Sequence, residues 1–327
     1  MSRVLVTGAS GWLGAAVARD LLAAGHEVRT LQRRPSGVEG VEDVLGSVTQ
    51  PAAVERAVQG VDAVVHLAAK VSFAGDEADF VAVNIEGTRT LVRAAKRTGV
   101  HRFVFVSSPS VAHTGEAIMG EDAPPAQPER ARGPYARTKA AAELIALGAD
   151  APGFAVVAVR PHIVWGPGDP QLVARVQQRA AAGRLPVVGS GAALVDSTYV
   201  DDAVSGIRAA LDAAERVHGN AYVLTSGEPR PISELFAGFC AAAGIAPPSR
   251  RVPAGAAKAA GSVVEAVWRI RPGADEPPMT RFLAEQLSTA HWFDLRRTMR
   301  DLQWRPEVGV TEGLRRLAAH HAPPPAF

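Results

Sequence analysis

The sequence is poor in several features that would point to particular kinds of protein. It contains one cysteine, Cys240, so no disulfide can form within the chain, and without a cysteine–histidine cluster no metal site is expected. The formal net charge is +2, and no basic run alternates with aromatic residues, which argues against nucleic acid as a partner. No uninterrupted apolar run reaches the roughly 18–20 residues of a membrane span. With no signal peptide either, we expect a soluble, cytoplasmic protein in which Cys240 is a buried thiol.

The first half of the chain alternates short apolar runs with alanine-rich helical stretches. Strands are expected at 4–6, 27–31, 63–66, 103–106 and 154–159, with a late strand at 221–225, and helices at 12–24, 52–58, 84–98 and 135–147. Apolar strands that alternate with helices are typical of a parallel sheet covered on both faces. The pattern predicts a doubly wound α/β fold, with a Rossmann dinucleotide-binding domain in residues 1–164 plus about 196–226. The remaining residues, about 165–195 plus 227–327, are expected to form a smaller, mainly helical substrate-binding region.

Three glycines follow the first expected strand and open the first expected helix. Gly8 permits a tight turn, Gly11 lets the backbone approach a pyrophosphate, and Gly14 lets the helix pack closely on the strand. The helix N-terminus adds N–H donors and a positive dipole end, both of which favour phosphate. A purely structural turn is the alternative. The expected dinucleotide contacts are Gly8, Ser10, Gly11, Trp12, Leu13 and Gly14.

The end of the second expected strand indicates which nicotinamide dinucleotide is bound. An acidic residue there would bind the adenosine ribose hydroxyls of NAD, whereas an arginine accommodates the 2′-phosphate of NADP. Residues 30–36 contain no Asp or Glu, but they contain Arg33 and Arg34. The sequence therefore predicts NADP(H), with Arg33 as the first choice for the phosphate contact and Arg34 as the second; a solvated arginine is the alternative.

Tyr135 and Lys139 are four residues apart on an expected helix, so their side chains share one face. An ammonium beside a phenol lowers the pKa of the phenol, which could then exchange a proton with a ketone or an alcohol near neutral pH. Ser108 follows an apolar strand at the sheet edge where doubly wound folds bind ligands, and its hydroxyl could hydrogen-bond a substrate oxygen. Each residue also has an alternative interpretation when taken singly: Tyr135 could be a half-buried ring, Lys139 a solvated amine, and Ser108 a hydroxyl that caps the strand end.

The glycine loop, Ser108 and the Tyr135/Lys139 pair, in this order, resemble the short-chain dehydrogenase/reductase superfamily, and the glycine spacing resembles its extended, epimerase-like branch. The resemblance implies that Tyr135 is the catalytic acid–base group, that Lys139 lowers its pKa and binds the nicotinamide ribose, and that Ser108 polarises the carbonyl. Further matching segments are His66–Ala69, Asn84–Thr88, Arg160–Pro161 with Gly166–Pro167, and Tyr199–Asp202.

The same resemblance implies further contacts and one weakness. Ala68 and Ala69 would line the cofactor site, and Pro161 and Ile163 would offer backbone groups to the nicotinamide carboxamide. Helices such as 84–98 and 135–147 would form a homodimer interface. Ser47 stands where the family usually has an aspartate near the adenine, which weakens that one contact.

The substrate branch is indicated by later segments. Val195 stands where sugar-nucleotide members usually carry an arginine that grips a diphosphate, which argues against a nucleotide sugar. Residues 164–173 resemble the 3β-hydroxysteroid dehydrogenase-like subgroup, and residues 227–229, 276–287 and 291–293 resemble the bacterial 2-alkyl-3-oxoalkanoate reductases of olefin biosynthesis. That resemblance implies NADPH-dependent reduction of a 3-oxo group on a small hydrophobic acyl substrate. A 3β-hydroxysteroid or sterol dehydrogenase, and an NADP-binding redox sensor without turnover, stay open as alternatives.

An acyl substrate needs an apolar cleft, and residues 253–271 form an amphipathic stretch that could close one. It could be a substrate lid, a helix in contact with a membrane surface, or a plain core-facing helix. The candidate substrate contacts are Lys70, Ser72, Phe73, His162, Trp165 and Arg281, with Lys70 or Arg281 as the cation for a carboxylate.

Overall fold

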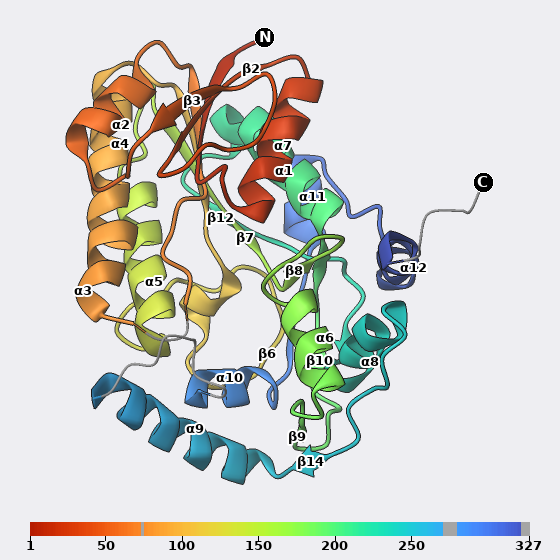
Figure 1. Cartoon of the computed structure of the whole chain (residues 1–327). Helices are drawn as coiled ribbons and strands as arrows, with labels where there is room; N and C mark the ends of the chain where they lie inside the picture. The colour runs from red at the N-terminus through yellow and green to blue at the C-terminus, as the bar shows by residue number, and fades with distance from the viewer. Residues whose placement is uncertain (73–74, 271–279, 322–327) are drawn as a thin grey trace.

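Seven parallel strands form a central sheet in the computed structural model, which describes residues 1–72, 75–270 and 280–321 (Figure 1). Their order is β12-β7-β5-β4-β1-β2-β3, and each neighbouring pair is parallel. The strands are β1 (Arg3–Thr7), β2 (Glu27–Gln32), β3 (Glu42–Leu45), β4 (Ala63–His66), β5 (Arg102–Val106), β7 (Ala155–Pro161) and β12 (Ala221–Leu224). The predicted doubly wound parallel sheet is confirmed.

Burial along the strands explains why most of them could be predicted. Every residue of β4 and β7 is buried, as expected for strands covered on both faces. In contrast, β3 lies at the edge of the sheet, begins with two acidic residues and is largely exposed. Its polar sequence carries no apolar run, so the strand was not predicted.

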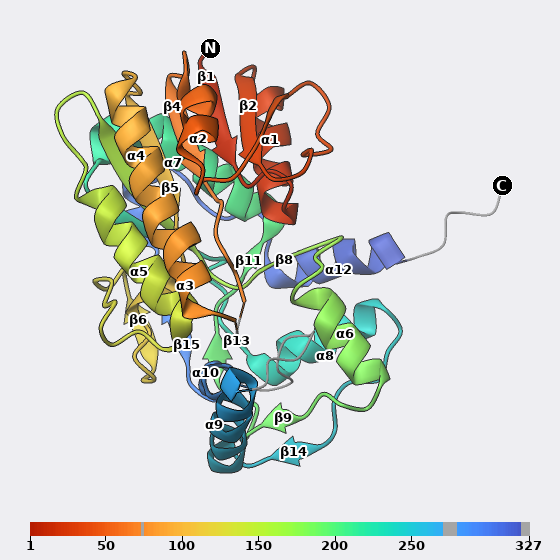
Figure 2. The same cartoon turned by 60° about the vertical axis from the view of Figure 1, so that its left-hand side comes forward.

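Helices cover both faces of the sheet (Figures 1 and 2). One face carries α1 (Trp12–Ala23) and α7 (Val200–Val217), and the other carries α2 (Pro51–Val58), α4 (Gly87–Arg97) and α5 (Gly133–Leu147). The helix expected at 84–98 begins earlier, with α3 (Glu77–Phe80) and a π-helical segment at Val81–Glu86 that runs directly into α4. π-Helical turns often occur at functional sites, and this one contains the buried Asn84.

The remaining elements lie mostly beyond the carboxyl ends of the strands, in the lower part of Figures 1 and 2. They include a four-stranded sheet of order β13-β10-β15-β6 and the pairs β11–β8 and β14–β9. The short strands are β6 (Ile118–Glu121), β8 (Val164–Trp165), β9 (Val187–Val188), β10 (Leu194–Val195), β11 (Thr198–Tyr199), β13 (Arg230–Pro231), β14 (Arg251–Val252) and β15 (His291–Phe293). The helices are a 3₁₀ turn at Pro109–Ala112, α6 (Val173–Ala181), α8 (Ile232–Ala242), α9 (Ala254–Ile270), α10 (Arg281–Gln286), α11 (Arg296–Leu302) and α12 (Val310–His321). Cys240 is buried on α8, as expected, and in the described part of the chain no helix combines the length and apolarity needed to cross a bilayer.

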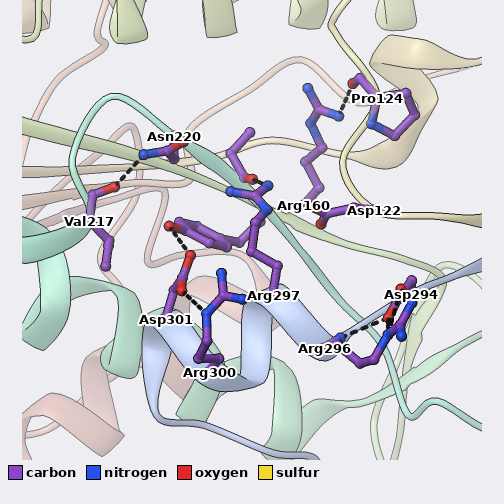
Figure 3. A network of polar contacts seen from close by, with 12 residues as sticks. Asp122, Pro124, Arg160, Val217, Asn220, Asp294, Arg296, Arg297, Arg300 and Asp301 are labelled. Atoms are coloured by element: carbon purple, nitrogen blue, oxygen red, sulfur yellow. Dashed lines mark hydrogen bonds and ion pairs between the residues drawn. The ribbon is translucent and has the colours of Figure 1, made fainter.

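A polar network fastens the C-terminal part to the edge of the main sheet (Figure 3). Arg297 on α11 pairs with Asp122 after β6 and donates to the carbonyl of Ala221 at 2.6 Å. Its guanidinium also lies 4.5 Å from the ring centroid of Tyr222, whose hydroxyl donates to Asp301 at 3.1 Å. These contacts join α11, the edge strand β12 and β6, and so hold the lower elements at a defined place against the sheet.

A buried ion pair attaches α5 to the sheet. Arg160 on β7 donates to both carboxylate oxygens of Glu143 on α5, at 2.9 and 2.5 Å. It also donates to the carbonyl of Pro124 at 2.5 Å (Figure 3). The two side chains are only 2% and 1% exposed. Such a pair is costly to break from one side because the remaining charge stays buried.

Two glycines let α1 approach the loop after β1. Gly8 has φ +80°, and a Cβ there would lie 2.9 Å from the backbone nitrogen of Ala68. A Cβ on Gly14 would lie 2.3 Å from the carbonyl oxygen of Gly8. Both neighbours are backbone atoms, so a side chain at Gly8 would collide with the loop after β4, and one at Gly14 would push α1 away from the loop after β1.

Glu143→Gln should lower the free energy of unfolding by about 3 kcal/mol, because the Arg160 guanidinium stays buried without its counter-charge. The shift of the urea midpoint at unchanged m-value measures the loss. Glu312→Gln removes an exposed partner of Arg315 and Arg316, at 2.7 and 2.8 Å, and is the control; it should leave the midpoint nearly unchanged. Equal midpoints for the two variants would contradict the role assigned to the buried pair.

Gly14→Ala should destabilise the protein by about 1–3 kcal/mol, because the added methyl group overlaps the Gly8 carbonyl. Gly255→Ala is the matched control: that glycine lies on α9, and no atom lies within 4 Å of the place that a Cβ would take, so the stability should stay the same or rise slightly. Differential scanning calorimetry of both variants checks this, and a Gly14→Ala protein as stable as the wild type would refute the close approach.

Candidate active site

A cleft of about 1140 Å³ opens at the carboxyl ends of the parallel strands, where the strand order reverses between β1 and β4. This is the place at which doubly wound sheets bind ligands. The structure brings all the predicted site residues into the wall of this one cleft. They are Gly8, Ser10, Gly11, Trp12, Leu13, Gly14, Arg33, Ala68, Ala69, Ser108, Tyr135, Lys139, Pro161 and Ile163.

Trp12 connects the glycine loop to a distant segment of the cleft wall. Its indole Nε1 donates to the carbonyl of Pro167 at 3.0 Å, and its ring lies beside Gly166 and Gly168. The sequence pointed to the Gly166–Pro167 turn through resemblance alone. The structure supplies a physical reason for it: a side chain on Gly166 would collide with Val200, and Gly168 has φ +75°, which favours glycine.

The far end of the cleft, after β2, is basic. Arg33 and Arg34 both line it and are both exposed. The nearby carboxylate of Asp43 on β3 is used internally, since it accepts from Thr30 at 2.5 Å, from Gln32 at 2.8 Å and from the backbone of Ser36 at 3.1 Å. Asp43 does not line the cleft. Among the described residues, the acidic residues that line it are Asp79 and Asp169, and neither comes from this end.

A buried chain of hydrogen bonds positions the loop after β4. Thr7 Oγ1 lies 2.7 Å from His66 Nδ1 and accepts from the backbone of Ala68 at 3.1 Å, while His66 Nε2 lies 3.0 Å from Thr88 Oγ1. Burial lowers the pKa of His66 to about 3, and the nearby Lys139 ammonium acts in the same direction. His66 is therefore a neutral connector between β1, β4 and α4.

Asn84 in the π-helical segment extends this connection to α5. Its side chain accepts from the backbone of Lys70 at 2.7 Å and donates to the carbonyl of Lys70 at 3.2 Å and to Thr138 Oγ1 at 3.0 Å. Thr138 directly precedes Lys139. The loop after β4 and the helix that carries Tyr135 and Lys139 are thus held by one side chain.

Ser108 and Tyr135 are coupled through their hydroxyl groups. Ser110 donates to Ser108 Oγ from its hydroxyl at 3.0 Å and from its backbone N–H at 3.3 Å. With its oxygen occupied as an acceptor, Ser108 has its own proton free to donate, and it hydrogen-bonds the Tyr135 phenol. Ser110 was not singled out from the sequence, although its two-residue spacing from Ser108 is typical of a hydroxyl that orients its neighbour.

The pKa of Tyr135 differs from the expectation. Burial raises it to about 12, and the hydrogen bond from Ser108 only partly opposes that rise. The expected lowering is therefore wrong for this structure, because the cost of burying a phenolate exceeds the gain from its neighbours. At neutral pH the phenol holds its proton.

Lys139 carries the complementary shift. Burial lowers the pKa of its ammonium to about 7, although the carboxylate of Glu143, one helical turn further along α5, acts to raise it. The Nζ atom lies 4.2 Å from the ring centroid of Phe105, over the aromatic face. A buried amine with a pKa near 7 is a recognised mark of functional sites.

The backbone after β7 is strained at the cleft. Ile163 has φ 45°, which is unfavourable for a β-branched residue. Thr198 holds this conformation by donating its hydroxyl to the carbonyl of His162 at 2.8 Å and its N–H to the carbonyl of Ile163 at 3.2 Å. Strain held in this way clusters at ligand sites.

The other half of the cleft wall was not foreseen from the sequence. It is largely apolar and is assembled from segments far apart in the chain, chiefly Ile118 on β6, Phe236 on α8 and Phe293 on β15. Three histidines also belong to it: His113 after the 3₁₀ turn, His162 after β7, and His291 on β15. Only His162 had been considered. The remaining apolar members include Leu185, Ile232, Phe282, Leu283 and Leu287.

The candidate substrate contacts have mixed outcomes. Lys70, Ser72 and His162 line the cleft, and Lys70 pairs with Asp79 at 2.5 Å. Trp165 does not line it: the indole is fully buried in the core and donates to Ser197 at 3.0 Å, so its suggested substrate contact is wrong. Arg281 also lies outside the wall and pairs with Glu285, and Phe73 lies outside the described residues.

The helix expected at 253–271 is α9, and it lies along α10 rather than in the cleft wall. Gly261 packs against the backbone of Thr280 and Arg281, while Val263 and Val267 are 64% and 52% exposed. Because α10 contributes Phe282 to the wall, α9 supports the wall from behind. Contact of the exposed face with a membrane surface stays a prediction.

Comparison with known proteins shows the family to which the chain belongs. The model of the NAD dependent epimerase/dehydratase family matches residues 4–225. A 2-alkyl-3-oxoalkanoate reductase of Stenotrophomonas maltophilia is 39% identical over 98% of this chain and 99% of its own, and one of Shewanella oneidensis is 36% identical over 98% and 86%. A 3-beta-hydroxysteroid dehydrogenase of Mycolicibacterium neoaurum is 32% identical over 94% and 87%.

Among solved structures, the UDP-glucose 4-epimerase of Thermus thermophilus in complex with NAD superposes with a TM-score of 0.70 at 28% identity, covering 98% of both chains. The family match covers the glycine loop, Ser108, Tyr135 and Lys139. The chain therefore belongs to the NAD dependent epimerase/dehydratase family, in the extended branch of the short-chain dehydrogenases/reductases, and is an oxidoreductase.

Proposed function

We propose that the protein is an NADP(H)-dependent reductase of the 3-oxo group of a hydrophobic acyl substrate, converting a 2-alkyl-3-oxoalkanoate to the 2-alkyl-3-hydroxyalkanoate. One observation carries the proposal: a dinucleotide-type glycine loop, the residues Ser108, Tyr135 and Lys139, and the largely apolar half of the wall all belong to a single cleft. We refer to that apolar half, which includes Ile118, Phe236 and Phe293, as the apolar chamber. The names of the two relatives at 39% and 36% identity supply the acyl substrate class.

The residues at the glycine-loop end fit a nicotinamide dinucleotide. The space that side chains on Gly8 and Gly14 would fill is taken by close backbone packing, so the N-terminus of α1 can face a pyrophosphate. Arg33 and Arg34 line the end after β2, and no lining carboxylate comes from that end. A guanidinium favours a 2′-phosphate, so we assign NADP(H).

When bound, the reduced cofactor supplies the hydride that reaches the ketone carbon. Ser108 and Tyr135 hydrogen-bond the ketone oxygen, and the Tyr135 phenol gives it a proton. A phenol with a raised pKa is protonated at neutral pH, which suits the reductive direction. Lys139, partly charged near pH 7, stabilises the phenolate that remains after the transfer.

The apolar chamber supports a hydrophobic substrate. Its wall contains Ile118, Phe236 and Phe293. Val195, which stands where sugar-nucleotide members usually carry an arginine, is buried on β10 and lies outside the cleft. A diphosphate would have no counter-charge from that strand. A long aliphatic chain, in contrast, gains free energy for each methylene that it buries.

A 3β-hydroxysteroid dehydrogenase is the second candidate, favoured by the name of the 32% identical relative. The same three residues would then work in the oxidative direction. Initial rates by cofactor absorbance with 2-alkyl-3-oxo acids and with 3-hydroxy sterols separate the two. Binding of NADPH with no turnover of either class would instead support a redox sensor.

Tyr135→Phe should retain NADPH binding and lose at least about 100-fold in turnover of a 2-alkyl-3-oxo acid, because the proton donor is removed. Cofactor fluorescence measures binding, and cofactor absorbance measures turnover. Tyr222→Phe makes the same chemical change at the edge of the main sheet, away from the cleft wall, and should keep its activity. Full turnover by Tyr135→Phe would exclude the mechanism.

Arg33→Ala should weaken NADPH about tenfold or more and leave NADH within about threefold, because only NADPH carries the 2′-phosphate that the guanidinium would bind. Titration of cofactor fluorescence gives both dissociation constants. Arg34→Ala tests the second candidate, and Arg19→Ala, on the exposed face of α1, is the control. Equal weakening of both cofactors by Arg33→Ala would refute the phosphate contact.

A further inference from the structure

Three histidines from separate elements form a row in the wall of the apolar chamber. His291 lies in the middle, with its ring centroid 5.4 Å from that of His162 and 5.7 Å from that of His113, each pair at an interplanar angle of 87°. Phe293 and Phe282 close the two ends, at 5.3 Å from His162 and 6.0 Å from His113. We refer to His113, His162 and His291 as the histidine row, and all three belong to the cleft that contains Tyr135.

Most nitrogens of the row lack a hydrogen-bond partner among the described residues. Nδ1 and Nε2 of His113, Nδ1 of His162 and Nδ1 of His291 are all buried and unpaired. The three side chains are only 1%, 6% and 2% exposed. By contrast, His66, which is just as buried, has both ring nitrogens within hydrogen-bond distance of threonine hydroxyls.

Four unpaired buried nitrogens in one wall need an explanation, because buried polar groups are almost always paired. A metal ion does not provide it: in the part of the chain that the structure describes, no three histidine, cysteine or carboxylate side chains converge on one point. A half-turn of an imidazole about its Cβ–Cγ bond exchanges its nitrogen and carbon edges within the same space. The row can therefore offer nitrogens to a molecule in the cleft.

The surroundings keep these imidazoles neutral. Burial lowers the pKa of all three histidines. The pKa of His162 falls to about 4 and that of His291 to about 2. Around His113, Glu285 on α10 acts to raise the pKa, while Arg132 before α5 and Lys258 on α9 act to lower it. A backbone hydrogen bond at Asp196 acts to raise the pKa of His162, and His113 acts to lower it. His162 and His113 act to lower the pKa of His291, and a backbone hydrogen bond at Gln286 acts to raise it. The Nε2 atom of His291 also lies 3.3 Å from Thr289 Oγ1. Each neutral ring has one N–H donor and one acceptor nitrogen.

The charged residues that line the cleft come from other segments than the histidine row; they are Arg33, Arg34, Lys70, Asp79, Lys139, Asp169, Arg175 and Arg179. Lys70 is paired with Asp79 after β4, and Arg175 and Arg179 line the cleft from α6. The chamber beside Tyr135 thus offers imidazole nitrogens within an apolar wall and no cation of its own from β6, β15 or α10 among the lining residues. The acyl substrate of the proposed function has one strongly polar group besides its ketone, the carboxylate.

Building on the proposed function, we propose that the histidine row binds the carboxylate of the 3-oxo acid. The carboxylate accepts from imidazole N–H groups and binds together with one proton taken from solvent, which is shared between carboxylate and imidazole. No covalent bond changes. The row thereby makes the site selective for the free acid over its esters and over ketones without a carboxyl group.

The test compares 2-hexyl-3-hydroxydecanoate with its methyl ester as substrates of oxidation by NADP⁺, because 3-oxo acids lose carbon dioxide in solution. The readout is the ratio of kcat/KM for the acid to kcat/KM for the ester. The wild type should prefer the acid by about tenfold or more at pH 6.5, the gain expected from hydrogen bonds to a charged group. In His113→Phe and His291→Phe the ratio should fall toward one, since phenylalanine keeps the ring packing without the nitrogens.

Phe293→Leu, in the same wall, alters packing but keeps every imidazole and should keep the ratio. Lys70→Met, Arg175→Met and Arg179→Met test the cations. Loss of the ratio in one of these three, with the histidine variants unchanged, would assign the carboxylate to a cation and overturn the proposal.

The wild type alone provides a second test that needs no variant to fold. Because the acid binds with a proton, its KM should rise about tenfold per pH unit between pH 6 and 8, while the KM of the ester should not. A common pH dependence would overturn the proposal. Turnover of both compounds with equal kcat/KM would refute carboxylate binding by the histidine row but would be consistent with the reductase function. Turnover of neither compound would refute the function itself.

Discussion

The buried ion pair between Glu143 and Arg160 is the contact on which the geometry of the active site depends. It is bidentate and removed from water, so a rotation of α5 against β7 would leave two buried charges unpaired. Lys139 lies one helical turn before Glu143 and Tyr135 one turn before that, so the setting that satisfies Arg160 also turns both side chains into the cleft. The same carboxylate opposes the fall of the Lys139 pKa.

Burial moves the two site pKa values in directions that suit one task. It raises that of Tyr135 to about 12 and lowers that of Lys139 to about 7. The pair therefore stands as a protonated phenol beside an amine that changes charge near neutral pH, which is the state that the proposed proton transfer from Tyr135 requires. A helical spacing of four residues indicates that the two groups meet, but the sign of each shift follows from how much water the surrounding structure removes.

The cleft has two halves with different origins. The dinucleotide half comes from loops that directly follow β1, β2, β4, β5 and β7, so local sequence patterns reached nearly all of it. The apolar half comes from β6, β15, α8 and α10, and its two short strands meet only in the folded chain, where residue 291 pairs with residue 118. No periodicity or turn signal in a single segment carries that pairing, which is why His113, His291 and Phe236 were missed.

The sequence by itself determined the doubly wound sheet, the glycine loop and the residues that the structure brings together in the cleft, because each depends on local features: apolar runs, a glycine spacing, and four residues on one helical face. It did not determine the edge strand β3 or the π-helical start of α4, where polar or mixed composition hides the element. Only the tertiary structure decided the protonation preferences of Tyr135 and Lys139 and the composition of the chamber. Burial and long-range register are properties of the packed chain, and both arise between segments that are far apart in the sequence.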